Sequence, residues 1–94
     1  MNLTREDVWI IVRDTIAEVA SGNGIDPEDI TRESQASELG LSSVDTIHTM
    51  IILEERLGDD IDLESLVMRN GEYASDLSLS ELHEHLCRRL AATA

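Results

Sequence analysis

Ser43 is the residue of this chain best suited to take part in chemistry, because it lies where a loop gives way to a predicted helix. The sequence LGLSSVDTI at residues 39–47 places two serines, Ser42 and Ser43, at this corner. The free N–H groups and the dipole of a helix N-terminus favour a phosphate. Ser43 is therefore suited to accept a phosphoryl group from another enzyme. The alternative is that both serines serve only as helix caps.

Two histidines lie near other reactive side chains in the sequence. His48 follows Ser43 by five residues, about 140° around a helix, so it is poorly placed to act as the base for that serine. His83 and Cys87 are four residues apart and share a helix face, but two ligands are too few for a structural zinc site. We expect His83 to be an exposed histidine beside a half-buried cysteine.

The acidic residues Asp60, Asp62 and Glu64 resemble the start of a calcium-binding loop. Such a loop needs glycine at its sixth position and glutamate at its twelfth, where this chain has Ser65 and Gly71. The spacing therefore argues against a calcium site. From spacing alone, we predict no metal site, and no Ser/His/Asp arrangement for catalysis is supported.

Composition limits the classes of partner. The 94 residues contain 7 basic and 20 acidic side chains, for a formal net charge of −13, and 41% of them are hydrophobic. Nucleic acids and anionic membranes are poor partners for such a chain, whereas a basic protein surface suits it. The single cysteine fits a reducing compartment, and the apolar runs are too short to span a membrane. We expect one cytoplasmic domain over residues 1–94.

Helix signals dominate the chain. A first helix is predicted over residues 4–20, with Thr4 and Asp7 in a capping-box arrangement. A long loop follows over residues 21–42, held by buried side chains at Ile25, Ile30 and Leu39.

A second helix is predicted over residues 43–57, with Ser42 as its N-cap and Asp45 at the capping-box position. Its apolar stripe is wider than a small core needs: Val44, Ile47, Met50, Ile51, Leu53 and Leu57. Acids crowd its end, where Arg56 is the only opposing base. A short helical turn at residues 62–68 and a last helix at 78–91 complete an all-α fold, a small antiparallel bundle of three to four helices with a long first loop.

Residues 39–47, together with LEERLGDDI at residues 53–61, resemble the acyl carrier protein family. The family pattern reads L-G-x-D-S-L-D-x-[VI], then L-E-E-x-[FL]-G and an isoleucine shortly afterwards. The segment GIDPEDIT at residues 24–31 is similar to the family's segment after its first helix. The resemblance covers nearly the whole chain and is weakest between residues 67 and 76. It implies the helical bundle of a carrier domain.

In that family, the serine that matches Ser43 carries 4′-phosphopantetheine, which a phosphopantetheinyl transferase attaches from coenzyme A. The terminal thiol then holds an acyl or aminoacyl group as a thioester. The resemblance therefore implies a monomeric, non-catalytic carrier that is loaded by acyl-transferring and acyl-processing enzymes with basic docking surfaces. The residues implied in docking are Ser42, Val44, Asp45, His48, Ile51, Glu54 and Glu55.

Several positions depart from the pattern of fatty-acid carriers. Ser42 stands where the family usually has aspartate, Val44 replaces a leucine, and His48 lies where many fatty-acid carriers have an acid. Asp62 stands where proline is frequent, and the region of residues 67–76 is longer. These departures favour a discrete carrier of a specialised pathway, such as polyketide or nonribosomal peptide assembly, over one of housekeeping fatty acid biosynthesis.

Two alternatives remain at this stage. One is a stand-alone peptidyl or aminoacyl carrier, although Asp45 and the Leu-Glu-Glu segment favour an acyl carrier. The other belongs to a different class: an acidic helical adaptor without a prosthetic group.

Overall fold

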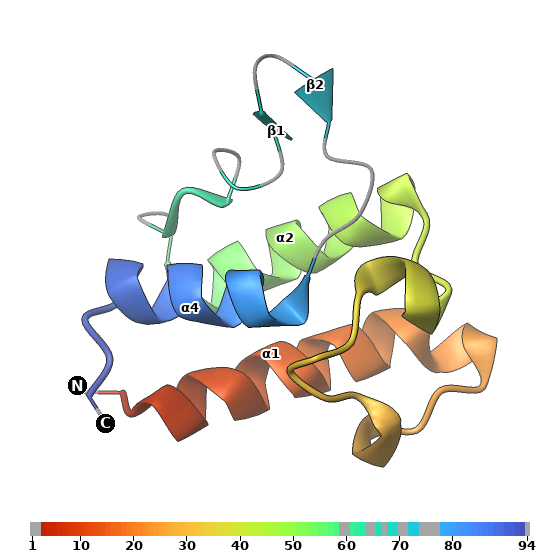
Figure 1. The fold of residues 1–94 in the computed structure, drawn as a ribbon, viewed down its shortest axis with the longest axis horizontal. Helices are drawn as coiled ribbons and strands as arrows, with labels where there is room; N and C mark the ends of the chain where they lie inside the picture. Colours follow the sequence, from red (N-terminus) through yellow and green to blue (C-terminus); the bar gives the residue numbers. More distant parts are fainter. Residues whose placement is uncertain are drawn as a thin grey trace.

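The computed structural model describes residues 3–58, 61–63, 66, 68–69, 72–73 and 78–93, and within them the chain is a helical bundle. Its helices are α1 (Arg5–Val19), α2 (Ser43–Leu57) and α4 (Leu79–Arg89). A short antiparallel ladder pairs β1 (Met68–Arg69) with β2 (Glu72–Tyr73). Both α2 and α4 lie against α1 and run in the opposite direction to it (Figure 1).

Helix α1 begins at the predicted capping box. The Asp7 N–H donates to Thr4 Oγ1 and the Thr4 N–H donates to Asp7 Oδ2, each over 3.0 Å. Its buried face carries Val8, Trp9, Val12, Thr15 and Ile16. Apolar residues at spacings of three and four therefore place one side of the helix in the core.

The loop that follows α1 is built from three short 3₁₀ turns: η1 (Ala20–Asn23), η2 (Pro27–Asp29) and η3 (Ala36–Leu39). Ile30 and Leu39 are buried and Ile25 is partly buried against the core, as the sequence predicts. The Leu79 N–H donates to the Ser34 carbonyl over 3.1 Å, which ties the loop to the start of α4.

The predicted helical turn at residues 62–68 is wrong at both ends. Asp62 is not helical and has a φ of 47°, a backbone conformation outside the right-handed helix. Leu63 and Leu66 are helical, but Met68 already belongs to β1. The apolar residues of this segment made helix and strand hard to distinguish from the sequence, because the run is short.

The core lies where α1, α2 and α4 meet, closed by Ile61 and Leu63 from the segment between α2 and α4. The two ends of the chain lie together in Figure 1. The Arg5 N–H donates to the Thr93 carbonyl over 2.7 Å and the Thr93 N–H to the Leu3 carbonyl over 2.9 Å. Within the described part of the chain, no helix combines the length and apolar character needed to cross a membrane.

Candidate functional site

Ser43 is the first residue of α2, and Ser42 is the N-cap of this helix. The Asp45 N–H donates to Ser42 Oγ over 3.2 Å, and the Ser42 N–H donates to Asp45 Oδ2 over 3.0 Å. This is the capping box predicted from the sequence. The two serines therefore differ in role: Ser42 caps the helix, and Ser43 takes no part in the capping box. The side chain of Ser43 lies outside the described part of the structure.

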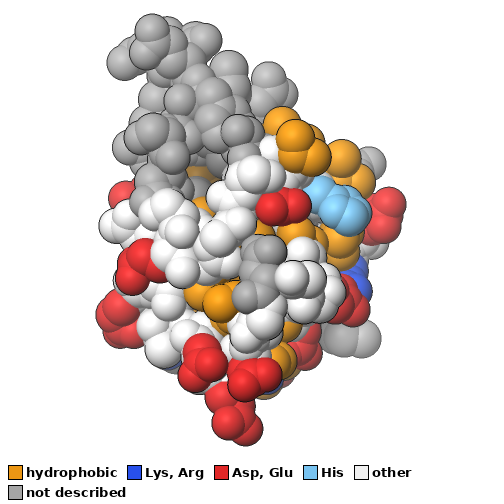
Figure 2. Space-filling view, turned by 90° about the vertical axis from the view of Figure 1, so that its right-hand side faces the viewer, with side chains coloured by type: hydrophobic (Ala, Val, Ile, Leu, Met, Phe, Trp, Pro, Cys, Tyr) orange, Lys and Arg blue, Asp and Glu red, His pale blue; other side chains and the backbone are white. Residues whose placement is uncertain are grey.

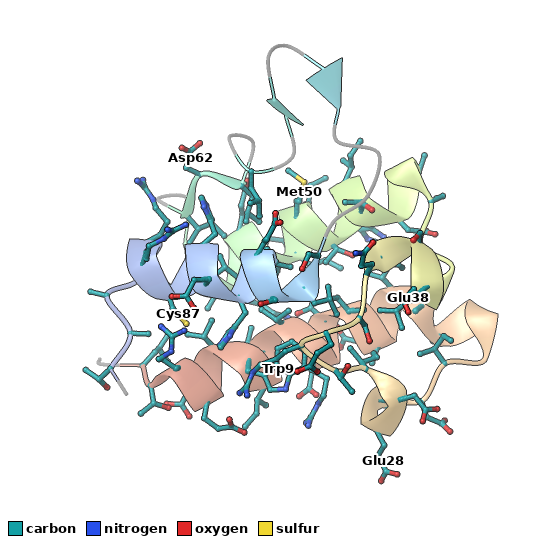
Figure 3. The ribbon with its side chains drawn as sticks, viewed as in Figure 1. Trp9, Glu28, Glu38, Met50, Asp62 and Cys87 are labelled. Carbon is teal, nitrogen blue, oxygen red and sulfur yellow. The ribbon has the colours of Figure 1, made fainter. Side chains whose placement is uncertain are left out.

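The corner before Ser42 is held by the turn η3. The Gln35 N–H donates to Glu38 Oε1 over 3.0 Å, and the Leu41 N–H donates to the Ala36 carbonyl over 3.1 Å. Gly40 has a φ of 73°, a conformation that glycine adopts without a steric cost. Figure 3 shows Glu38 on this turn beside the N-terminal end of α2. These contacts fix the direction in which the chain enters the helix.

One face of α2 exposes large apolar side chains. Val44 is 75% exposed, Ile47 46% and Ile51 50%, whereas Leu53 on the opposite side is fully buried. Figure 2 shows hydrophobic side chains beside a histidine at this end of the molecule. The wide apolar stripe is therefore divided between the core and the surface: its Leu53 side is buried and its Val44 side faces outward.

The other residues implied in docking lie around this face. His48 and Glu55 are exposed and lie within about 40° of Val44 around the helix axis. Glu54 is half-buried, and Ser42 and Asp45 belong to the capping box. Val44, His48, Ile51 and Glu55 therefore share the outward side of α2. Asp45 and Glu54 lie about 100° and 80° from Val44, in opposite directions around the helix axis.

Arg56 points away from the acids that surround it in the sequence. Its guanidinium donates to Thr15 Oγ1 over 2.8 Å and to Glu18 Oε2 over 2.6 Å, both on α1. Thr15 is fully buried. Sequence reasoning treated Arg56 as the base opposing Glu54 and Glu55. Arg56 is the only basic residue in α2, and this was the one sequence signal that pointed to a contact with another element.

The expectation of an exposed His83 is wrong, because His83 is 5% exposed and Cys87 is 2% exposed. The imidazole Nε2 of His83 lies 2.8 Å from the Arg5 carbonyl and 3.4 Å from Cys87 Sγ. A carbonyl oxygen only accepts hydrogen bonds, so Nε2 carries the proton and cannot act as a base toward the thiol.

Burial raises the pKa of the Cys87 thiol. This cysteine, labelled in Figure 3, is therefore an unreactive part of the core rather than a nucleophile. His85 also has a structural contact, since its Nε2 lies 2.6 Å from the Ile61 carbonyl.

A shallow cavity of about 480 Å³ lies between the start of α1 and α4. Arg5 pairs with Glu84 there, and Arg32 pairs with Glu6 over 2.9 Å, so the two cations are matched by two carboxylates. The Arg32 guanidinium also lies over the Trp9 ring, 5.3 Å from its centroid. With its charges balanced internally, this cavity does not favour a ligand of either sign.

Metal binding finds no support in the described residues. No group of three or more histidine, cysteine, aspartate or glutamate side chains among them could hold a metal ion. Asp62, from the candidate calcium loop, is exposed, whereas Asp60 and Glu64 lie outside the described residues.

No protein-family model, curated protein or solved structure matches this chain. The start of α2 is therefore the candidate site on the strength of its own residues: a serine that is not the cap, at a fixed helix N-terminus, beside an exposed apolar face.

Proposed function

We propose that the protein is a discrete acyl carrier that holds acyl intermediates as thioesters on a 4′-phosphopantetheine arm attached to Ser43. One observation carries the proposal: the Ser42–Asp45 capping box leaves Ser43 out of the cap at the start of α2, next to the exposed side chains of Val44, Ile47 and Ile51. A carrier needs such a pairing, because the arm on the modified serine must enter partner active sites while the surface around the serine docks.

The start of α2 suits the phosphate of such an arm. The first N–H groups of a helix lack acceptors within the helix, and the helix dipole favours a negative charge there. In the attachment step, the Ser43 hydroxyl forms a bond to the phosphorus next to the pantetheine of coenzyme A. The pyrophosphate linkage breaks, adenosine 3′,5′-bisphosphate leaves, and the hydroxyl proton passes to the transferase. The arm then supplies a thiol for acyl groups.

The pathway we favour is a specialised one, of the polyketide or nonribosomal peptide type. Ser42 and His48 stand where fatty-acid carriers often have acids, so the surface around the start of α2 is less acidic than the family pattern. The exposed apolar face of α2 supports partners that bind through hydrophobic contacts.

Intact mass spectrometry tests the attachment. Incubation with a broad-specificity phosphopantetheinyl transferase, Mg²⁺ and coenzyme A should add one phosphopantetheine to the wild-type chain. Ser43→Ala should gain no mass. Ser42→Ala is the matched control and should still be modified, although loss of the cap costs about 1 kcal/mol of stability.

Two results would contradict the assignment. Modification of Ser43→Ala would place the arm elsewhere, and an unmodified wild-type chain would favour the adaptor without a prosthetic group. For the modified carrier, loading with a panel of acyl-coenzyme A donors against amino-acid-adenylating enzymes separates an acyl carrier from a peptidyl or aminoacyl carrier.

A further inference from the structure

Two buried threonines on α2 bond back to carbonyl groups of the preceding turn. Thr46 Oγ1 donates to the Ser42 carbonyl over 3.0 Å, and Thr49 Oγ1 donates to the Asp45 carbonyl over 2.8 Å. Thr46 is 7% exposed and Thr49 is 3% exposed, so neither side chain can meet a partner at the surface. A helical carbonyl already accepts the N–H of the residue four positions later, so each hydroxyl adds a second hydrogen bond.

The Ser42 carbonyl belongs to the peptide unit that joins Ser42 to Ser43. It accepts the Thr46 N–H over 2.9 Å as well as the Thr46 hydroxyl. Because a peptide unit is planar, two hydrogen bonds to its oxygen also fix the direction of the Ser43 N–H and the position of the Ser43 Cα. Thr46 therefore acts on the backbone that carries the Ser43 side chain.

The capping box and Thr46 hold different groups of Ser42. Asp45 binds the N–H and the hydroxyl of Ser42 over 3.0 and 3.2 Å, whereas Thr46 binds its carbonyl. The Ser43 N–H is one of the first N–H groups of α2, which have no acceptor within the helix. It is therefore available to a phosphate at this helix N-terminus.

We propose, on the basis of the function proposed above, that Thr46 is a positioning residue for attachment of the arm. Its hydroxyl aligns the peptide unit before Ser43, so that the Ser43 hydroxyl meets the phosphorus of coenzyme A from a fixed direction. Thr46 is buried and touches neither coenzyme A nor the transferase, so it acts only through the backbone. Thr49 makes the same kind of hydrogen bond to a peptide unit that does not contain Ser43.

Steady-state kinetics of a broad-specificity phosphopantetheinyl transferase test this role, with the full chain as the varied substrate. Thr46→Val keeps the shape of the side chain and removes the hydroxyl. It should lower kcat about fivefold and leave KM unchanged, because a small misplacement of a reacting group slows the chemical step without weakening binding. Thr46→Ser keeps a hydroxyl and should have the wild-type kcat. Thr49→Val is the matched control: it should lower the melting temperature about as much as Thr46→Val does and leave kcat unchanged.

A second measurement uses the unmodified chain and needs no transferase. In ¹H–¹⁵N NMR spectra, Thr46→Val should shift the amide signal of Ser43 more than Thr49→Val does, because the lost hydrogen bond was to the same peptide unit.

The positioning role is overturned if Thr46→Val keeps the wild-type kcat, if Thr49→Val lowers kcat equally, or if Thr46→Ser does not restore it. An unchanged Ser43 amide signal in Thr46→Val overturns the positioning role alone. A wild-type chain that gains no mass overturns the proposed function, and with it the role of Thr46 in attachment.

Discussion

Arg56 shows how one side chain can hold two helices in place. Its guanidinium reaches the hydroxyl of Thr15, which has no exposed surface, and the carboxylate of Glu18. The ion pair with Glu18 is largely exposed, so it contributes little to stability. The bond to the buried hydroxyl contributes more, because an unmatched polar group in the core loses its hydration without compensation.

Replacement of Arg56 by Met should therefore lower the free energy of unfolding by about 1 kcal/mol, as measured by urea denaturation. Arg13→Met is the matched control, because among the described residues Arg13 pairs only with its exposed neighbour Asp14 on the same helix. The control should change stability by less than about 0.5 kcal/mol. Equal losses in the two variants would show that the contact with Thr15 has no energetic role.

Local residue patterns were readable from the sequence and long-range contacts were not. The capping boxes at Thr4 and Ser42 each join residues three apart, so the sequence predicts them directly. Arg56 lies 41 residues from Thr15, and no local sequence pattern identifies Thr15 as its hydrogen-bond partner. The burial of His83 was missed for the same reason, because it depends on the Arg5 carbonyl, 78 residues away.

At the scale of elements, the start of α1 depends on an ionised carboxylate. A hydrogen bond from the Thr4 N–H lowers the pKa of Asp7, and Arg5 similarly lowers the pKa of Glu84 on α4. A carboxylate whose pKa is lower in the folded state stabilises the fold above its unfolded pKa, and this stabilisation is lost as the pH falls through the folded value.

We therefore expect protonation of Asp7 to lower the melting temperature of the wild type as the pH falls below about 4, the unfolded pKa of aspartate, in addition to the general effect of neutralising the net charge. Asp7→Asn should reduce that fall, because the variant lacks the group whose protonation costs stability. Glu28→Gln, at an exposed position on η2 that Figure 3 labels, should leave the fall unchanged. A fall in Asp7→Asn as steep as in the wild type would contradict the role given to the capping box.

The elements with a clear apolar period were predicted most accurately from the sequence. α1, α2 and α4 each have an apolar stripe and a capping serine or threonine, and their observed bounds lie within two residues of the expected ones. The long loop was expected to hold buried anchors, but its three 3₁₀ turns were not predicted individually. Each turn is too short to show an apolar period, although its hydrogen bonds are local, such as that from the Ile30 N–H to the Pro27 carbonyl.

At the scale of the whole molecule, the sequence predicted a helical bundle because apolar spacing is repeated along most of the chain. It also predicted that part of α2 would remain outside the core, because the stripe there was too wide. The paired β1 and β2 were not predicted, since two-residue strands are too short for an alternating pattern to be recognised.

Charge also acts at this scale. A formal net charge of −13 on 94 residues opposes the compact state through self-repulsion. Repulsion between charges spread over a surface acts at longer range than the attraction within an ion pair. Added salt therefore weakens the repulsion more than it weakens the ion pairs. The described ion pairs are largely exposed and contribute little that salt could remove. The net effect of screening is therefore stabilising.

The melting temperature should rise by about 2–4 °C as NaCl increases from about 10 to 150 mM, since the Debye length falls from about 30 to 8 Å and relieves about 0.5 kcal/mol of repulsion. Circular dichroism at fixed pH measures this shift. KCl at matched ionic strength should give the same shift, because screening does not distinguish the two cations, and an equal concentration of sucrose controls for solute effects. A melting temperature that falls with NaCl would mean that the exposed ion pairs outweigh the repulsion.

Partner affinity should fall over the same salt range, because screening that relieves repulsion within the carrier also weakens its attraction to a basic surface.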